Sequence, residues 1–169
     1  MIEMELVGVR VELPANQPIV LLKERHGTRY LPIWIGAVEA TAIAFALQGV
    51  ETPRPLTHDL FVEVLGQLGA ELAAVHVTAL RDGTFFAELH LSLAGNTMTV
   101  SARPSDAIAL ASRLDDVPIF GAEQVLDEAG LEIEPGTEEG EEGGVDAEEA
   151  VRQFREFLDD ISPEDFREQ

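Results

Sequence analysis

Apolar and polar residues alternate in the first part of the chain, which is the pattern of half-buried β-strands. Valine and leucine alternate with polar or small residues over 7–13, and the pattern ends at Pro14. Two apolar runs follow at 19–23 and 30–35. Pro32 belongs to the third of these predicted strands and has no backbone N–H, so we expect it at a sheet edge or a bulge.

A period of about 3.6 residues then replaces the alternation and predicts two amphipathic helices. The first opens at Gly36 and closes at Gly49, and the second opens at Asp59 and closes at Gly69. The residues expected on their core faces are Ala40, Ile43, Ala44 and Leu47 in the first helix, and Leu60, Phe61, Val64, Leu65 and Leu68 in the second.

The second half of the chain repeats this order. Segments 29–49 and 96–116 both run from an extended apolar stretch into an Ala-rich helix, with Glu39 and Asp106 as the acidic residues of the first turns. Strands before grouped helices favour an α+β domain over a doubly wound one. We therefore predict an internal duplication of a β-β-β-α-α unit, with a largely antiparallel sheet packed with helices. The second unit is expected to have strands near 72–80, 85–93 and 97–102 and helices near 105–114 and 122–129.

Charge divides the chain unevenly. Residues 1–121 hold 14 Asp and Glu against 8 Lys and Arg, whereas the remaining residues hold 18 against 3, for a total of −21. We predict a domain over 1–133, an acidic Glu/Gly-rich disordered linker over 134–146, and an amphipathic C-terminal helix and tail over 147–169. The apolar stripe of that helix consists of Val151, Phe154, Leu158 and Ile161.

Composition excludes several kinds of chemistry. The chain of 169 residues has no cysteine, so disulfides, thiolate metal sites and cysteine nucleophiles are absent. No apolar stretch approaches the roughly 20 residues of a membrane span, and the N-terminus lacks a basic segment before an apolar run. We expect a soluble, cytoplasmic protein. Neither of the common glycine patterns for phosphate binding follows a predicted strand.

Three acidic residues lie at predicted helix starts, namely Glu39, Asp59 and Asp106. Each fits a structural role, because a carboxylate in the first turn satisfies free N–H groups and the positive end of the helix dipole. Ser105 also fits a helix cap. Acidic first turns are common, so this spacing alone does not decide between capping and catalysis.

The neighbours of these carboxylates add a functional interpretation. Arg54 and Arg103 precede prolines at two of the starts, and His58 lies beside the second carboxylate. The three carboxylates could hold Mg²⁺ or Mn²⁺, with His58 as general base, while Arg54, Arg103 and Ser105 bind phosphate. Together they could hydrolyse a phosphodiester bond, provided that folding brings them together.

A second possible metal site lies in the predicted hairpin of the second half. If the apolar residues share one face, His76 is set opposite His90 and Thr78 opposite Glu88, which gives a surface that could bind zinc. A tight two-residue turn at 82–83 would shift the register and separate the two histidines. A solvated polar face is the alternative.

Several motifs occur in a fixed order along the chain: RYLPIWIG at 29–36, EA at 39–40, RPLTHDL at 54–60, DGTFFAEL at 82–89, ARPSDAIALA at 102–111 and PIF at 118–120. Together they resemble the bifunctional nuclease domain family of bacteria and plants, over roughly residues 4–133. The resemblance implies a compact α+β domain whose relatives cleave both RNA and DNA, and a cytoplasmic bacterial protein. The motif positions that we expect at the site are Glu39, Arg54, His58, Asp59, Arg103, Ser105 and Asp106, with Trp34 as a stacking or packing residue.

The net charge argues against a nuclease, because affinity for nucleic acid draws mainly on Lys and Arg contacts to phosphates. The competing hypothesis is a non-enzymatic, homo-oligomeric binding or regulatory module. In that case the apolar stripe of the C-terminal helix would dock on its own domain or on a neighbouring subunit. A weaker alternative is a small-molecule sensor that uses a pocket between the two repeats.

Overall fold

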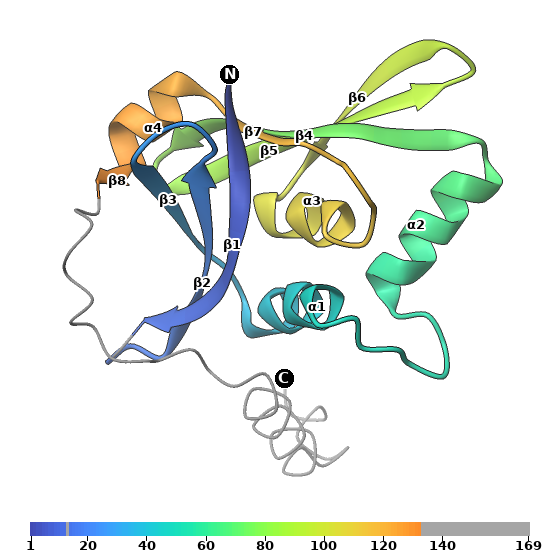
Figure 1. Cartoon of the computed structure of the whole chain (residues 1–169), viewed down its shortest axis with the longest axis horizontal. Coiled ribbons are helices and arrows are strands. Elements are labelled where there is room, and N and C mark those ends of the chain that lie inside the picture. Colours follow the sequence, from blue (N-terminus) through green and yellow to red (C-terminus); the bar gives the residue numbers. More distant parts are fainter. Residues whose placement is uncertain (13, 133–169) are drawn as a thin grey trace, which may run out of the picture.

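The computed structural model of the chain describes residues 1–12 and 14–132 (Figure 1). The linker predicted at 134–146 and the helix predicted at 147–169 lie outside the described residues. The strands are β1 (Ile2–Glu12), β2 (Gln17–Glu24), β3 (Arg29–Trp34), β4 (Ala70–Arg81), β5 (Thr84–Leu93), β6 (Asn96–Ala102), β7 (Ile119–Gly121) and β8 (Leu131–Glu132). The helices are α1 (Ala37–Leu47), α2 (Thr57–Gln67), α3 (Pro104–Ala111) and α4 (Glu123–Ala129).

All the described strands form one sheet in the order β6-β5-β4-β7-β1-β2-β3-β8. Two antiparallel meanders, β1 to β3 and β4 to β6, are joined by β7, which runs antiparallel to β1 and parallel to β4. The predicted α+β fold with a largely antiparallel sheet is therefore confirmed. The duplication stays a prediction, because β7 separates the two helices of the second half, whereas α1 and α2 follow each other directly.

The first strand starts earlier than the alternation predicts, at Ile2 rather than at residue 7. Its pairing with β2 shifts between Leu6 and Gly8, so Val7 occupies a bulge and is 43% exposed. A bulge adds one residue to one strand and inverts the alternation beyond it, which hides the first part of the strand from a simple period-two pattern. By contrast, the edge position predicted for Pro32 is confirmed, because β8 pairs with β3 only at Arg29 and Tyr30.

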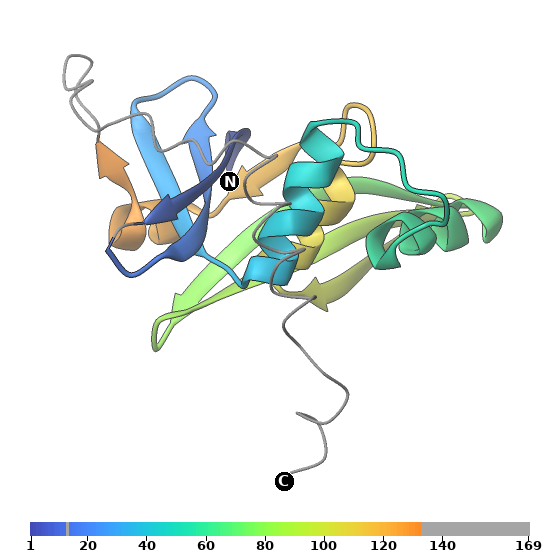
Figure 2. The same cartoon turned by 90° about the horizontal axis from the view of Figure 1, so that it is seen from below.

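Helix α3 is the centre of the helical layer, and nearly all of its residues are buried. It packs on β4 and β5, and α1 and α2 pack against it (Figures 1 and 2). Its alanines carry only a methyl group, so the helix can approach the sheet closely. On α1, Ala40 and Ile43 of the predicted core face are buried, whereas Leu47 is 49% exposed.

The core face predicted for α2 is wrong in most of its residues. Leu65 packs against the core together with Val62, which was not predicted. The other four residues are exposed, namely Leu60, Phe61, Val64 and Leu68. At about 100° per residue these four form a continuous arc beside the buried side of the helix. Periodicity identifies the apolar arc of α2, but the neighbouring elements cover only one part of it.

The hairpin of β4 and β5 has a two-residue turn, in which Asp82 and Gly83 both have positive φ, at 49° and 74°. Irregularities in β4 shift the register further, so His76 faces Glu88, and the predicted pairings of His76 with His90 and of Thr78 with Glu88 are wrong. The two imidazole rings nevertheless lie close together, with centroids 3.8 Å apart, because they are diagonal neighbours. None of the described helices could cross a membrane.

Candidate active site at three helix starts

Four of the predicted site residues form one ionic cluster that joins the starts of α1, α2 and α3. Arg103 donates from Nε and Nη2 to the two carboxylate oxygens of Asp106, at 2.7 and 3.1 Å. Its Nη1 lies 2.9 Å from Glu39 Oε1. His58 Nε2 lies 3.2 Å from Asp106 Oδ1. We call these four residues the helix-start cluster.

The cluster is partly open to solvent. The side chain of Arg103 is 66% exposed, whereas that of Asp106 is 33% exposed and that of His58 is 16% exposed. A guanidinium carries five N–H donors. Two of those on Arg103 donate to Asp106, and Nη1 forms an ion pair with Glu39, so further N–H donors remain for a bound group. The cluster therefore combines a shielded imidazole with a guanidinium that solvent can reach.

Asp106 is ionised at neutral pH. Burial raises the pKa of this carboxyl, but hydrogen bonds from Arg103 and His58 outweigh burial and hold the pKa below the ordinary value of 3.8. An ionised carboxylate only accepts hydrogen bonds, so His58 Nε2 must donate and Nδ1 is left to accept a proton. Because the pKa is lowered by folding, the contacts of Asp106 add stability above pH 3.8, and this stability is lost as the pH falls through the folded value.

Gly36 precedes α1 and makes room for Glu39. A Cβ atom at position 36 would overlap with the carboxylate of Glu39, whereas the backbone φ of −75° suits any residue. A larger residue at position 36 would therefore make the flexible end of the Glu39 side chain move, and with it the ion pair to Arg103. Glu39 does not cap its helix through a side-chain hydrogen bond, so its described polar contact is the ion pair with Arg103.

Asp59 does not join the cluster. Its Oδ1 accepts a hydrogen bond from Arg113 Nε at 2.5 Å, and its Oδ2 accepts one from the backbone N–H of Leu56 at 2.8 Å. The second contact confirms the predicted capping role at the start of α2. Burial raises the pKa of Asp59, but the hydrogen bonds from Arg113 and Leu56 outweigh it, and the pKa is lowered. Asp59 is thus held by an ion pair between α2 and the end of α3.

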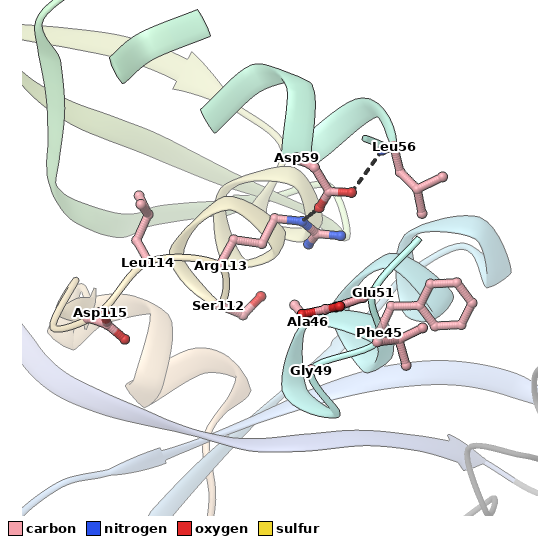
Figure 3. A pocket seen from close by; sticks show the side chains of 11 residues that line it. Phe45, Ala46, Gly49, Glu51, Leu56, Asp59, Ser112, Arg113, Leu114 and Asp115 are labelled. Atoms are coloured by element: carbon pink, nitrogen blue, oxygen red, sulfur yellow. Dashed lines mark hydrogen bonds and ion pairs between the residues drawn. The ribbon is translucent and has the colours of Figure 1, made fainter. Parts of the chain in front are cut away.

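The pair of Asp59 and Arg113 lines a cavity of about 360 Å³ (Figure 3). Phe45 and Ala46 of α1 and Glu51 lie on its other side. The sequence analysis missed Arg113, whose side chain is only 8% exposed. No motif in the sequence marks it, because Arg113 lies in the turn that follows α3, which ends at Ala111.

The remaining predicted residues lie away from the cluster contacts. Ser105 is buried, at 6% exposure, and the cap position of α3 belongs to Arg103, so the capping predicted for Ser105 is wrong. Arg54 lies in the exposed loop before α2, where its carbonyl accepts a hydrogen bond from Thr52 at 2.6 Å. Trp34 is 47% exposed, and its indole N–H donates to Glu12 at 2.7 Å.

The residues present do not fit the predicted Mg²⁺ or Mn²⁺ site. The oxygens of Asp59 are bound by Arg113 and Leu56, and those of Asp106 are bound by Arg103. Within residues 1–12 and 14–132, no group of three His, Cys, Asp or Glu side chains could hold a metal ion. The same finding gives no support to zinc at His76, Glu88 and His90.

The molecule is a small α+β domain in which helices α1, α2 and α3 cover one sheet. The starts of these helices bring a His–carboxylate pair together with an arginine, which are the components of acid–base chemistry. The chain matches the Bifunctional nuclease domain family over residues 20–134, a range that contains the whole helix-start cluster. It belongs to this family.

Relatives of the chain fall into two groups. An uncharacterized protein of Mycobacterium tuberculosis strain H37Rv is 50% identical over 165 residues, which cover 98% of both chains. Bifunctional nuclease 1 of Arabidopsis thaliana is 33% identical over 103 residues, or 59% of this chain and 32% of the plant protein. Bifunctional nuclease 1 of Oryza sativa subsp. japonica is 28% identical over 121 residues, or 70% of this chain and 36% of the rice protein. The matched segment of this chain therefore spans about a third of the length of each plant protein.

Proposed function

We propose that this protein is a nuclease that hydrolyses phosphodiester bonds of RNA and DNA at the helix-start cluster. The observation that carries the proposal is the contact of His58 with the ionised carboxylate of Asp106, beside the exposed guanidinium of Arg103. Family membership and the names of the plant relatives support the same activity. The motifs RPLTHDL and ARPSDAIALA supply three of the four cluster residues.

His58 would act as the general base. Asp106 accepts a hydrogen bond from Nε2, which fixes the ring and stabilises the imidazolium that forms when Nδ1 takes a proton. DNA has no 2′-hydroxyl group, so a single mechanism for both nucleic acids needs another nucleophile, for which we propose water. The proton therefore passes from water to His58 Nδ1 as the water oxygen attacks phosphorus. The bond between phosphorus and one of the two sugar oxygens then breaks, and the leaving oxygen takes a proton from solvent water. Such a base contributes about 10²- to 10⁴-fold to the rate.

Arg103 would bind the phosphate. Its remaining N–H donors can contact phosphate oxygens and stabilise the charge that develops on them. Arg54 is a second candidate phosphate contact, because it lies in the exposed loop that leads into α2. Glu39 and Asp106 together outweigh the charge of Arg103, so we expect substrate affinity to be weak. This expectation agrees with the acidic composition of the chain.

The test is a cleavage assay with the purified full chain on single-stranded RNA and DNA oligonucleotides, in Mg²⁺, in Mn²⁺ and in EDTA. The His58→Asn variant should be about 100-fold slower or more. The matched control is His26→Asn, which removes an exposed imidazole from the turn between β2 and β3 and should leave the rate unchanged. Equal rates for the wild type and both variants would indicate a contaminating nuclease.

The alternative function is a non-enzymatic, homo-oligomeric module. Exposed apolar residues on α2 and β6 favour an assembly of some kind, but an enzyme can also be an oligomer. The assay separates the two functions, because a wild-type chain that cleaves neither nucleic acid in any of the three conditions would favour the module.

A further inference from the structure

The cavity beside the helix-start cluster has no part in the chemistry proposed above. It lies between the end of α1, the start of α2 and the turn after α3, so both halves of the chain contribute to its walls (Figure 3). His58 and Asp59 are consecutive residues of α2 and connect the two places. His58 contacts Asp106 of the cluster, whereas Asp59 lines the cavity. A nucleic acid with a phosphate at the cluster can therefore place a nearby nucleotide at the cavity.

Arg113 brings a positive charge to the wall of the cavity from a buried position. Its side chain is only 8% exposed. Nε donates to Asp59 at 2.5 Å and Nη1 donates to the carbonyl oxygen of Ala109 at 2.8 Å, so two contacts hold the guanidinium in place. Among residues 1–12 and 14–132, none accepts a hydrogen bond from Nη2. The guanidinium is therefore fixed in advance and keeps N–H donors for a ligand.

Glu51 carries the opposite charge on another wall of the cavity. Its carboxylate and the guanidinium of Arg113 are directed towards the same space, yet these two described side chains form no ion pair (Figure 3). The space between them suits a group with N–H donors on one edge and acceptors on another. Three of the lining residues are carboxylates and one is an arginine, so an anionic ligand is disfavoured. Apolar walls are supplied by Phe45, Val50, Leu56 and Leu114.

We propose that this cavity binds a guanine base of the nucleic acid that is cleaved at the helix-start cluster, an inference that rests on the proposed nuclease function. Guanine is uncharged and planar, and it has both kinds of edge. Its N1–H and N2–H₂ groups lie side by side and match the two oxygens of the Glu51 carboxylate. Its O6 and N7 atoms accept hydrogen bonds from arginine, which is the commonest specific contact to this base.

The other bases fit less well. Adenine, cytosine, thymine and uracil lack the adjacent pair of N–H groups, so each would leave an oxygen of Glu51 without a partner, and a site built for hydrogen bonds rejects a ligand that leaves them unmade. The size of the cavity also suits a base with its sugar. Its volume of about 360 Å³ lies within the range of about 300 to 1,000 Å³ that is usual for small-ligand sites.

Binding of free nucleosides tests the cavity without any cleavage. In NMR titrations of the full chain, guanosine should bind about tenfold or more tightly than adenosine, cytidine or uridine. Glu51→Gln should weaken guanosine binding about tenfold, because an amide cannot accept on both of its atoms. Glu51 is exposed in the loop between α1 and α2, so this variant should keep the wild-type circular dichroism spectrum. The matched control is Glu63→Gln, at an exposed carboxylate of α2 outside the cavity, which should leave the affinity unchanged.

Equal affinities for the four nucleosides, or guanosine binding that Glu51→Gln leaves intact, would overturn the proposal. Free alanine belongs in the same titration, because its ammonium and carboxylate groups also match the two opposite charges of the cavity. Tighter binding of alanine than of guanosine would overturn the proposal as well, and would assign the cavity to a small zwitterion.

Mapping of the cleavage positions separates this inference from the nuclease function. On single-stranded RNA and DNA oligonucleotides that contain one guanine, the wild-type chain should cut at a fixed position relative to that base, and Glu51→Gln should lose this preference. Cleavage without regard to guanine would overturn the inference and leave the nuclease function in place. A chain that binds guanosine but cleaves neither nucleic acid would contradict the nuclease function, while the cavity would still be supported as a guanine site.

Discussion

At the scale of single residues, two aspartates at the contact between α2 and α3 differ in their partners. Asp106 contacts an imidazole and an exposed guanidinium, so it can orient a base. Asp59 contacts Arg113, whose side chain is almost fully buried. A buried guanidinium needs a partner, because an unpaired charge away from water is costly. Asp59 therefore contributes to the stability of the fold, whereas the contacts of Asp106 suit the proposed chemistry.

Asp59→Asn should lower the free energy of unfolding by about 2 kcal/mol, because it leaves the buried guanidinium of Arg113 without its carboxylate partner. The loss is smaller than for a fully buried ion pair, because the side chain of Asp59 is 35% exposed. Urea denaturation measures this change. The control is Asp82→Asn, which removes a carboxylate at a turn where φ is 49° and where asparagine is well tolerated. A stable Asp59→Asn variant that has lost its nuclease activity would contradict the assignment and place Asp59 in the active site.

At the scale of elements, α2 has more apolar surface than its neighbours cover. His58 and Leu65 lie on the side that faces α3 and the core, whereas Leu60 and Val64 face outwards. The polar contacts at the start of α2, from His58 to Asp106 and from Asp59 to Arg113, fix this helix on α3. The position of the proposed base therefore depends on the inward side of α2.

Two matched substitutions measure the difference between the sides of α2. Leu65→Ala should lower the free energy of unfolding by about 2 kcal/mol, because it removes methyl groups packed against the core. Leu60→Ala makes the same chemical change at a residue that is 51% exposed and should cost less than about 0.5 kcal/mol. Equal costs would contradict the described exposure and would mean that something covers the outward side.

At the scale of the whole molecule, the sequence predicted those strands that have a regular apolar alternation of their own. The strands near 72–80, 85–93 and 97–102 were predicted within a few residues, because alternation continues through each of them. Strands β7 and β8 have three and two residues, which is too short for any period. The bulge in β1 has a mark in the sequence, because it falls at Gly8, whose φ is 147°, and a glycine within a strand often indicates a bulge.

The site was predictable only in part, because the order of the strands in the sheet decides which helix starts come together. Glu39 and Arg103 lie far apart in the chain and meet because α1 packs on α3. The sequence identified His58, Arg103 and Asp106 through their motifs, yet nothing in their spacing showed that Asp59 would turn towards Arg113. Neighbouring residues of one helix point in directions about 100° apart, so a motif can place one in a site and the next outside it.

The measurement that tests the central claim most directly is a double-mutant cycle for cleavage of single-stranded RNA and DNA by His58→Asn, Asp106→Asn and the combined variant. If Asp106 acts through the imidazole of His58, each single substitution should lower kcat/KM by about 10²-fold or more, and the combined variant should be no slower than the slower single variant. Single variants that cleave at the wild-type rate, or losses that multiply in the combined variant, would contradict a shared role of these two residues in catalysis.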